Sequence, residues 1–97
     1  MEVSANQLSV RLLIRGHVQG VFFRAWCGKA AEGLELRGWI RNRRDGSVEC
    51  VFAGDAAAVA EMIEKCHIGP PAARVDAVER LPGPNDVDHG FRQLPNE

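Results

Sequence analysis

Apolar and polar residues alternate at the start of the chain. In the stretch LSVRLLIR (8–15), Val10, Leu12 and Ile14 fall on one face and arginines fall on the other. A period of two residues is typical of a strand with one buried face. The sequence therefore predicts a first strand over 8–15.

Two later segments have the period of an amphipathic helix, with apolar residues every three or four positions. The first spans about 22–34, and its apolar stripe is Phe23, Cys27, Ala30, Ala31 and Leu34. The second spans about 55–66, and its stripe is Val59, Met62, Ile63 and Cys66. Asp55 is predicted to cap the second helix.

The remaining apolar runs predict strands. LRGWIRN (36–42) and SVECVFA (47–53) are joined by a segment containing Asp45-Gly46, a strong hairpin signal, so these strands should pair antiparallel. AARVDAVER (72–80) predicts the last main strand, and a loop then leads to a short segment at Phe91.

The order strand, helix, strand, strand, helix, strand indicates an α+β fold. Two βαβ-like halves of this kind form a ferredoxin-like βαββαβ sandwich, in which two helices cover one face of a mainly antiparallel sheet. We expect residues 1–97 to form a single domain with an ordered core over about 8–94, because 97 residues leave no room for a second core. The fold names no function, since it hosts many.

Composition excludes several classes of protein. Hydrophobic residues make up 45% and charged residues 26%, which is ordinary for a soluble domain, and no apolar run is long enough to cross a membrane. The polar N-terminus is not a signal peptide, so we expect a cytoplasmic protein. Cys27, Cys50 and Cys66 lack metal-ligand spacing, and we expect reduced, buried thiols and no metal site.

Charge is unevenly distributed. The net charge is -1, which argues against nucleic acid as a partner. Residues 11–44 nevertheless carry eight Arg or Lys against two Glu, whereas residues 45–97 carry four basic against ten acidic residues. The basic half favours a small anionic ligand over a long polyanion.

The stretch GHVQGVFFR (16–24) lies in this basic half and leads from the first strand into the first helix. A glycine-bearing turn before a helix N-terminus points backbone N–H groups at one place, where the helix dipole also favours an anion. Arg24 would add a planar fork suited to two phosphate oxygens. A tight turn with a surface arginine would give the same pattern, because isolated glycine motifs are weak signals.

Other phosphate-site chemistries are missing. No GK[ST] follows the glycines, so this is not a nucleotide-binding P-loop. From His17 to Arg24 the spacing resembles that of cysteine-dependent phosphatases, but Val18 stands where the thiolate would be. His17 could act as a general base, although a solvated loop histidine is the simpler interpretation.

Three motifs together resemble the acylphosphatase family: GHVQGVFFR (16–24), GWIRNRRDGSVE (38–49) and GPPAARV (69–75), in this order over nearly the whole chain. The resemblance implies the ferredoxin-like fold, a substrate-binding role for Arg24 and a water-positioning role for Asn42. It also implies a phosphate cradle formed by the loop Gly16, His17, Val18, Gln19, Gly20 and Val21.

Several positions depart from the family pattern. Glu35 stands where the family usually has glycine, with Gly33 two residues earlier, so we expect an altered end of the first helix. Cys27 replaces a frequent Thr or Ser, and Gln93 occupies a usually apolar position. Trp26 could line the acyl side of a substrate, although a packing role is the simpler expectation.

The resemblance implies an enzyme that hydrolyses the carboxyl–phosphate bond of small acyl phosphates by direct in-line attack of water. It needs no metal, cofactor or covalent intermediate. The expected partner is the small-molecule substrate alone, with no nucleic acid, no membrane and a monomeric chain. The alternative is a non-catalytic module that senses phosphate. RNA binding is a third and weaker interpretation, because the central strands lack paired stacking aromatics.

Overall fold

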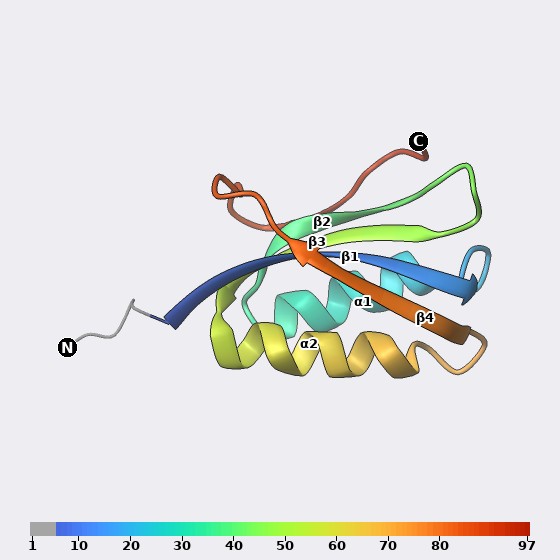
Figure 1. The fold of residues 1–97 in the computed structure, drawn as a ribbon, viewed down its shortest axis with the longest axis horizontal. Helices are drawn as coiled ribbons and strands as arrows, with labels where there is room; N and C mark the ends of the chain where they lie inside the picture. Colours follow the sequence, from blue (N-terminus) through green and yellow to red (C-terminus); the bar gives the residue numbers. More distant parts are fainter. Residues whose placement is uncertain (1–5) are drawn as a thin grey trace.

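The computed structural model describes residues 6–97 and contains two helices and five strands (Figure 1). The elements follow the predicted order, with one further short strand at the C-terminal end. They are β1 (Gln7–His17), α1 (Phe23–Gly33), β2 (Arg37–Asn42), β3 (Val48–Asp55), α2 (Ala56–Ile68), β4 (Arg74–Pro82) and β5 (Phe91–Gln93).

The strands form one sheet in the order β4-β1-β3-β2-β5. Neighbouring strands are antiparallel except β2 and β5, which run parallel. Both helices cover the same face of this sheet (Figure 1). The predicted ferredoxin-like α+β fold is therefore confirmed, with β5 as an added edge strand that Phe91 anchors by stacking on Phe52 at 5.5 Å between ring centroids.

The core lies between the sheet and the two helices. Its largest fully buried apolar side chains include Leu12, Ile14, Phe23, Phe52 and Met62. The three cysteines lie here as free, buried thiols, as predicted. Burial raises the pKa of the Cys27 and Cys50 thiols well above the ordinary value, which keeps them protonated at neutral pH.

The first strand is longer than the alternation predicts, because β1 continues through Gly16 and His17. A register shift between Arg15 and Gly16 lets the strand stay paired with β4, whose first residue is Arg74. Gly16 has φ 133°, and a Cβ placed there would lie 2.1 Å from the Arg74 carbonyl oxygen. Only glycine permits this close approach, which lets β1 stay paired with β4 up to His17. The loop therefore begins at Val18.

The end of α1 is a regular Schellman motif despite its unusual residue. Glu35 takes φ 57° in the left-handed region, and the Glu35 and Leu36 N–H groups donate to the carbonyls of Glu32 and Ala31 at 3.0 and 2.9 Å. We expected Gly33 to alter this helix end. Instead Gly33 is the last helical residue, and Glu35 adopts the conformation that glycine usually supplies.

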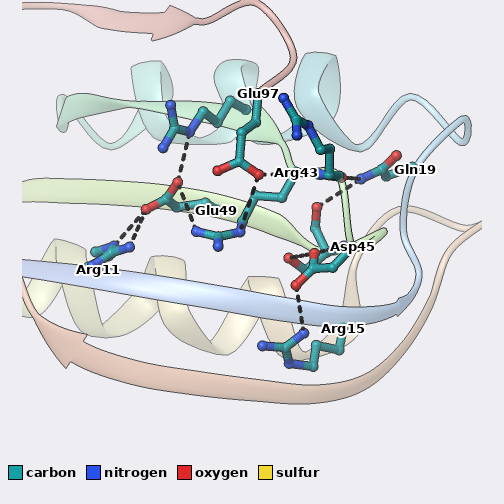
Figure 2. A network of polar contacts seen from close by, with 10 residues as sticks. Arg11, Arg15, Gln19, Arg43, Asp45, Glu49 and Glu97 are labelled. Carbon is teal, nitrogen blue, oxygen red and sulfur yellow. Dashed lines mark hydrogen bonds and ion pairs between the residues drawn. The ribbon is translucent and has the colours of Figure 1, made fainter.

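The sheet face opposite the helices carries a buried carboxylate. Glu49 is 2% exposed, and its oxygens accept hydrogen bonds from the Nε atoms of Arg11 and Arg41 at 2.6 and 2.8 Å (Figure 2). Arg43 Nη1 lies 3.5 Å from the same carboxylate. These four side chains, called here the Glu49 cluster, join β1, β3 and the end of β2.

The cluster keeps Glu49 ionised. Burial by itself raises the pKa of this carboxyl, but the hydrogen bonds and charges of Arg41 and Arg11 outweigh burial and lower the pKa below its usual value. A carboxyl whose pKa is lower in the folded than in the unfolded chain stabilises the fold above the unfolded pKa. The contribution disappears as the pH falls through the folded pKa.

Glu35→Gly should stabilise the protein by about 0.5 to 1 kcal/mol, because it removes the cost of a left-handed conformation at an exposed residue. Urea denaturation measures the change. The matched control is Glu32→Gly, an exposed position within α1, which should destabilise by about 1 kcal/mol. Equal losses in both variants would contradict the assigned role of Glu35.

Glu49→Gln should lower the free energy of unfolding at pH 7 by about 2 kcal/mol. This is less than the roughly 3 to 5 kcal/mol typical of a fully buried pair, because the arginines are partly exposed. The difference from the unsubstituted protein should shrink as the pH falls below the ordinary glutamate pKa of about 4.3 and through the lowered pKa of Glu49. Denaturation over pH 3 to 7 tests this, with the exposed Glu79→Gln as control. A difference that is independent of pH would contradict the assignment.

Candidate active site

A cavity of about 270 Å³ lies where the loop after β1, the N-terminus of α1 and the end of β2 meet. This volume suits a small ligand. The cavity brings together four residues that the sequence indicated for the site, Val18, Gly20, Arg24 and Asn42, and adds Phe22, Phe23, Ala25 and Gln93.

The loop turns its two valines toward the core. Val18 and Val21 are 0% and 8% exposed and belong to the hydrophobic core. Gly20 is exposed, with φ 74° in the left-handed region. The loop therefore borders the cavity at Val18 and Gly20, while the side chains of Val18 and Val21 anchor it in the core.

Four residues of the predicted cradle do not line the cavity: Gly16 and His17, which belong to β1, and Gln19 and Val21. Gly16 and His17 pair with Val75 and Arg74 of β4. His17 is exposed. This placement gives no support to His17 as a general base.

Gln19 connects the loop to the hairpin between β2 and β3 (Figure 2). Its Nε2 donates to the carbonyl oxygens of Arg43 and Ser47, both at 2.8 Å. One carboxamide thus satisfies two carbonyls and fixes the loop against the residue that follows Asn42. The Gln19 side chain does not line the cavity but connects the two segments that do.

The hairpin turn that receives Gln19 is itself held by Asp45. The Ser47 N–H donates to Asp45 Oδ1 at 2.9 Å, and the Gly46 N–H donates to the Arg43 carbonyl at 3.1 Å. Hydrogen bonds from the Ser47 side chain and backbone lower the pKa of Asp45 to about 2, with a smaller contribution from Arg15. The turn therefore keeps its charged acceptor throughout the physiological pH range.

The N-terminus of α1 borders the cavity. No side chain within residues 6–97 caps it, and its first turn contains no acidic residue. Its first N–H groups have no partner within the helix and carry the positive end of the helix dipole. Arg24, the second helical residue, lines the cavity, and its Nη1 donates to the Leu94 carbonyl at 3.3 Å.

Asn42 reaches the cavity from the other side. It is the last residue of β2 and lies on the same sheet face as the buried Ile40, which packs toward the helices. Its carbonyl accepts the Glu97 N–H at 2.9 Å, so the C-terminal segment fixes its backbone. An uncharged amide and a guanidinium from different elements thus line one small cavity.

The other arginines of the basic segment lie elsewhere. Arg11, Arg41 and Arg43 belong to the Glu49 cluster, and Arg15 lies 3.3 Å from the Asp45 carboxylate. Arg24 is the charged residue among the eight that line the cavity. The surplus of positive charge in residues 11–44 therefore comes more from arginines that surround Glu49 on the sheet face opposite the helices than from the cavity.

Sequence reasoning did not assign Phe22, Phe23, Ala25 or Gln93 to the site. Gln93 was noted only as a polar residue at a usually apolar position. It enters the cavity from β5, whose parallel pairing with β2 has no local sequence signal. Trp26 packs edge-to-face on Phe23, with 5.3 Å between ring centroids, and does not line the cavity.

Residues 6–97 contain no group of three or more His, Cys, Asp or Glu side chains arranged to hold a metal ion. None of the helices in this range is long and apolar enough to span a membrane.

The family model and the curated relatives indicate one family. The acylphosphatase family model matches residues 10–93. An acylphosphatase of Rhizorhabdus wittichii is 49% identical over 93% of this chain and 91% of its own length. An acylphosphatase of Nitrobacter hamburgensis is 60% identical over 74% of this chain and 73% of its own.

A solved structure extends the similarity to three dimensions. The acylphosphatase of Coxiella burnetii superposes with a TM-score of 0.87 at 35% identity, over 92% of this chain and 94% of its own. The chain therefore belongs to the acylphosphatase family of hydrolases.

Proposed function

We propose that this protein hydrolyses the carboxyl–phosphate bond of small acyl phosphates by direct in-line attack of water, without a metal or a covalent intermediate. Membership of the family supports hydrolysis of acyl phosphates. The observation that carries the mechanism is that Arg24 and Asn42, from α1 and β2, line the same small cavity.

Arg24 and the backbone from Val18 to the start of α1 are proposed to bind the phosphoryl group. Phosphoryl transfer depends on positioning and on stabilising charge that spreads over the equatorial oxygens. A guanidinium beside an uncapped helix N-terminus supplies both. No lining residue carries a negative charge that would oppose the substrate.

Water is the proposed nucleophile. The eight lining residues include no Ser, Thr, Cys, His, Asp or Glu, so the cavity offers no side chain that could form a phosphoenzyme. The Asn42 amide can both accept from and donate to a water molecule, and this supports its water-positioning role.

The leaving group needs no general acid. An acyl phosphate releases a carboxylate whose conjugate acid has a pKa of about 4, so it departs as the anion at neutral pH. This matches a cavity whose polar lining side chains are one guanidinium and two amides. In the proposed reaction, the phosphate of the substrate accepts the proton of the attacking water, and the products are a carboxylate and inorganic phosphate.

A phosphate-sensing module remains the second candidate, since the Arg24 side of the cavity alone would suffice to bind phosphate. Asn42 favours the enzyme, because a binding module needs no oriented water. We further propose a monomeric, cytoplasmic protein whose partner is the small-molecule substrate, with no nucleic-acid or membrane partner.

Asn42→Ala should separate the two candidates. The unsubstituted protein should hydrolyse benzoyl phosphate, followed by the change in ultraviolet absorbance, at the same rate with and without EDTA. Asn42→Ala should lower kcat by about 100- to 1,000-fold, the usual effect of losing one preorganised polar contact. The inhibition constant of inorganic phosphate should stay within about threefold, because Asn42 is proposed to contact water and not the anion.

Asn85→Ala, at an exposed asparagine outside this cavity, is the matched control and should leave both constants unchanged. Absence of turnover together with tight phosphate binding would favour the sensing module. An equal weakening of phosphate binding and turnover in Asn42→Ala would place Asn42 in the anion site instead.

A further inference from the structure

A large aromatic side chain lies exposed at the rim of the cavity. Within residues 6–97, the exposed large hydrophobic side chains are Phe22 and Ile68, at 83% and 76% exposure. Ile68 ends α2 and does not line this cavity, whereas Phe22 does. Exposed aromatic surface beside a binding cavity is available to a ligand.

The local fold does not account for phenylalanine at position 22. Its backbone has φ 61° and ψ 23°, a left-handed conformation that bulky residues rarely adopt. Phe22 precedes the first turn of α1, and its side chain makes no capping hydrogen bond. Glycine or asparagine would suit this backbone better, and an 83% exposed ring gains little from packing.

The other lining residues offer no comparable surface. Gly20 and Ala25 are exposed but small, Gln93 is polar, and the Phe23 ring is 2% exposed because it belongs to the core. Phe22 is therefore the lining residue, among those the structure describes, that is at once large, apolar and accessible.

We propose that Phe22 contacts the acyl group of the substrate and favours aromatic or bulky apolar acyl phosphates over acetyl phosphate. This inference rests on the proposed function. With the phosphoryl group held at Arg24 and the loop backbone, the acyl group extends toward the rim of a cavity of only about 270 Å³. There the Phe22 ring offers a flat apolar face, on which a planar aromatic group can stack.

The test compares kcat/KM for benzoyl phosphate and acetyl phosphate. Phe22→Gly and Phe22→Asn, which both suit a positive φ, should lower the benzoyl-to-acetyl ratio about fivefold. This is the factor expected when about 40 Å² of apolar surface is no longer shielded from water. Phe22→Tyr, which keeps the ring, should retain the ratio. Ile68→Ala, the matched exposed apolar control, should leave both values unchanged.

The outcomes distinguish this proposal from the proposed function on which it rests. A benzoyl-to-acetyl ratio that stays the same in both Phe22→Gly and Phe22→Asn, with the unsubstituted protein active, would overturn the acyl contact alone. Failure of the unsubstituted protein to hydrolyse either substrate would overturn the proposed function and this proposal with it. Circular dichroism and urea denaturation of each variant test whether the variant is still folded.

Discussion

The geometry of the site depends on one carboxamide. Gln19 donates to the carbonyls of two residues on either side of the hairpin turn, Arg43 and Ser47. These residues lie 24 and 28 positions away in sequence, so the two hydrogen bonds join the loop after β1 to the strand end that carries Asn42. Loss of the carboxamide would leave two carbonyls without this partner and let the two halves of the site separate.

A second constraint acts on the other face of the sheet. The Glu49 cluster holds Arg41 and Arg43, the two neighbours of Asn42, while Asn42 itself faces the helices. Because side chains alternate between the two faces along β2, Arg41 contacts Glu49 on one face and Asn42 lines the cavity on the other. The cluster also keeps these guanidinium groups out of the cavity, where Arg24 supplies the positive charge.

Local sequence signals predicted most of the fold. The alternation in β1, the Asp45-Gly46 turn and the Asp55 cap, whose Oδ2 accepts from the Ala57 and Ala58 N–H groups at 3.2 and 3.4 Å, each depend on neighbouring residues. Long-range features were missed. The extension of β1 past Arg15 depends on β4, and the burial of Glu49 depends on arginines from two other strands.

The same distinction applies to the candidate site. Family resemblance pointed to Arg24 and Asn42, and the structure brings both to one cavity. It could not indicate Gln93, which arrives through the parallel pairing of β5, or the exposure of Phe22 at the rim. The loop pattern alone also could not distinguish the residues whose backbone borders the cavity from Gly16 and His17, which pair within the sheet.

The central claim is that an anion binds between the loop after β1 and Arg24. Titration with inorganic phosphate, followed by two-dimensional ¹H–¹⁵N NMR, tests it most directly in the unsubstituted protein and in Arg24→Lys. The account predicts saturable shifts of the backbone amides from Val18 to Arg24. It also predicts at least about tenfold weaker binding in Arg24→Lys, because an ammonium cannot replace the planar fork. Unchanged affinity in Arg24→Lys, or shifts confined to the Glu49 cluster, would contradict the account.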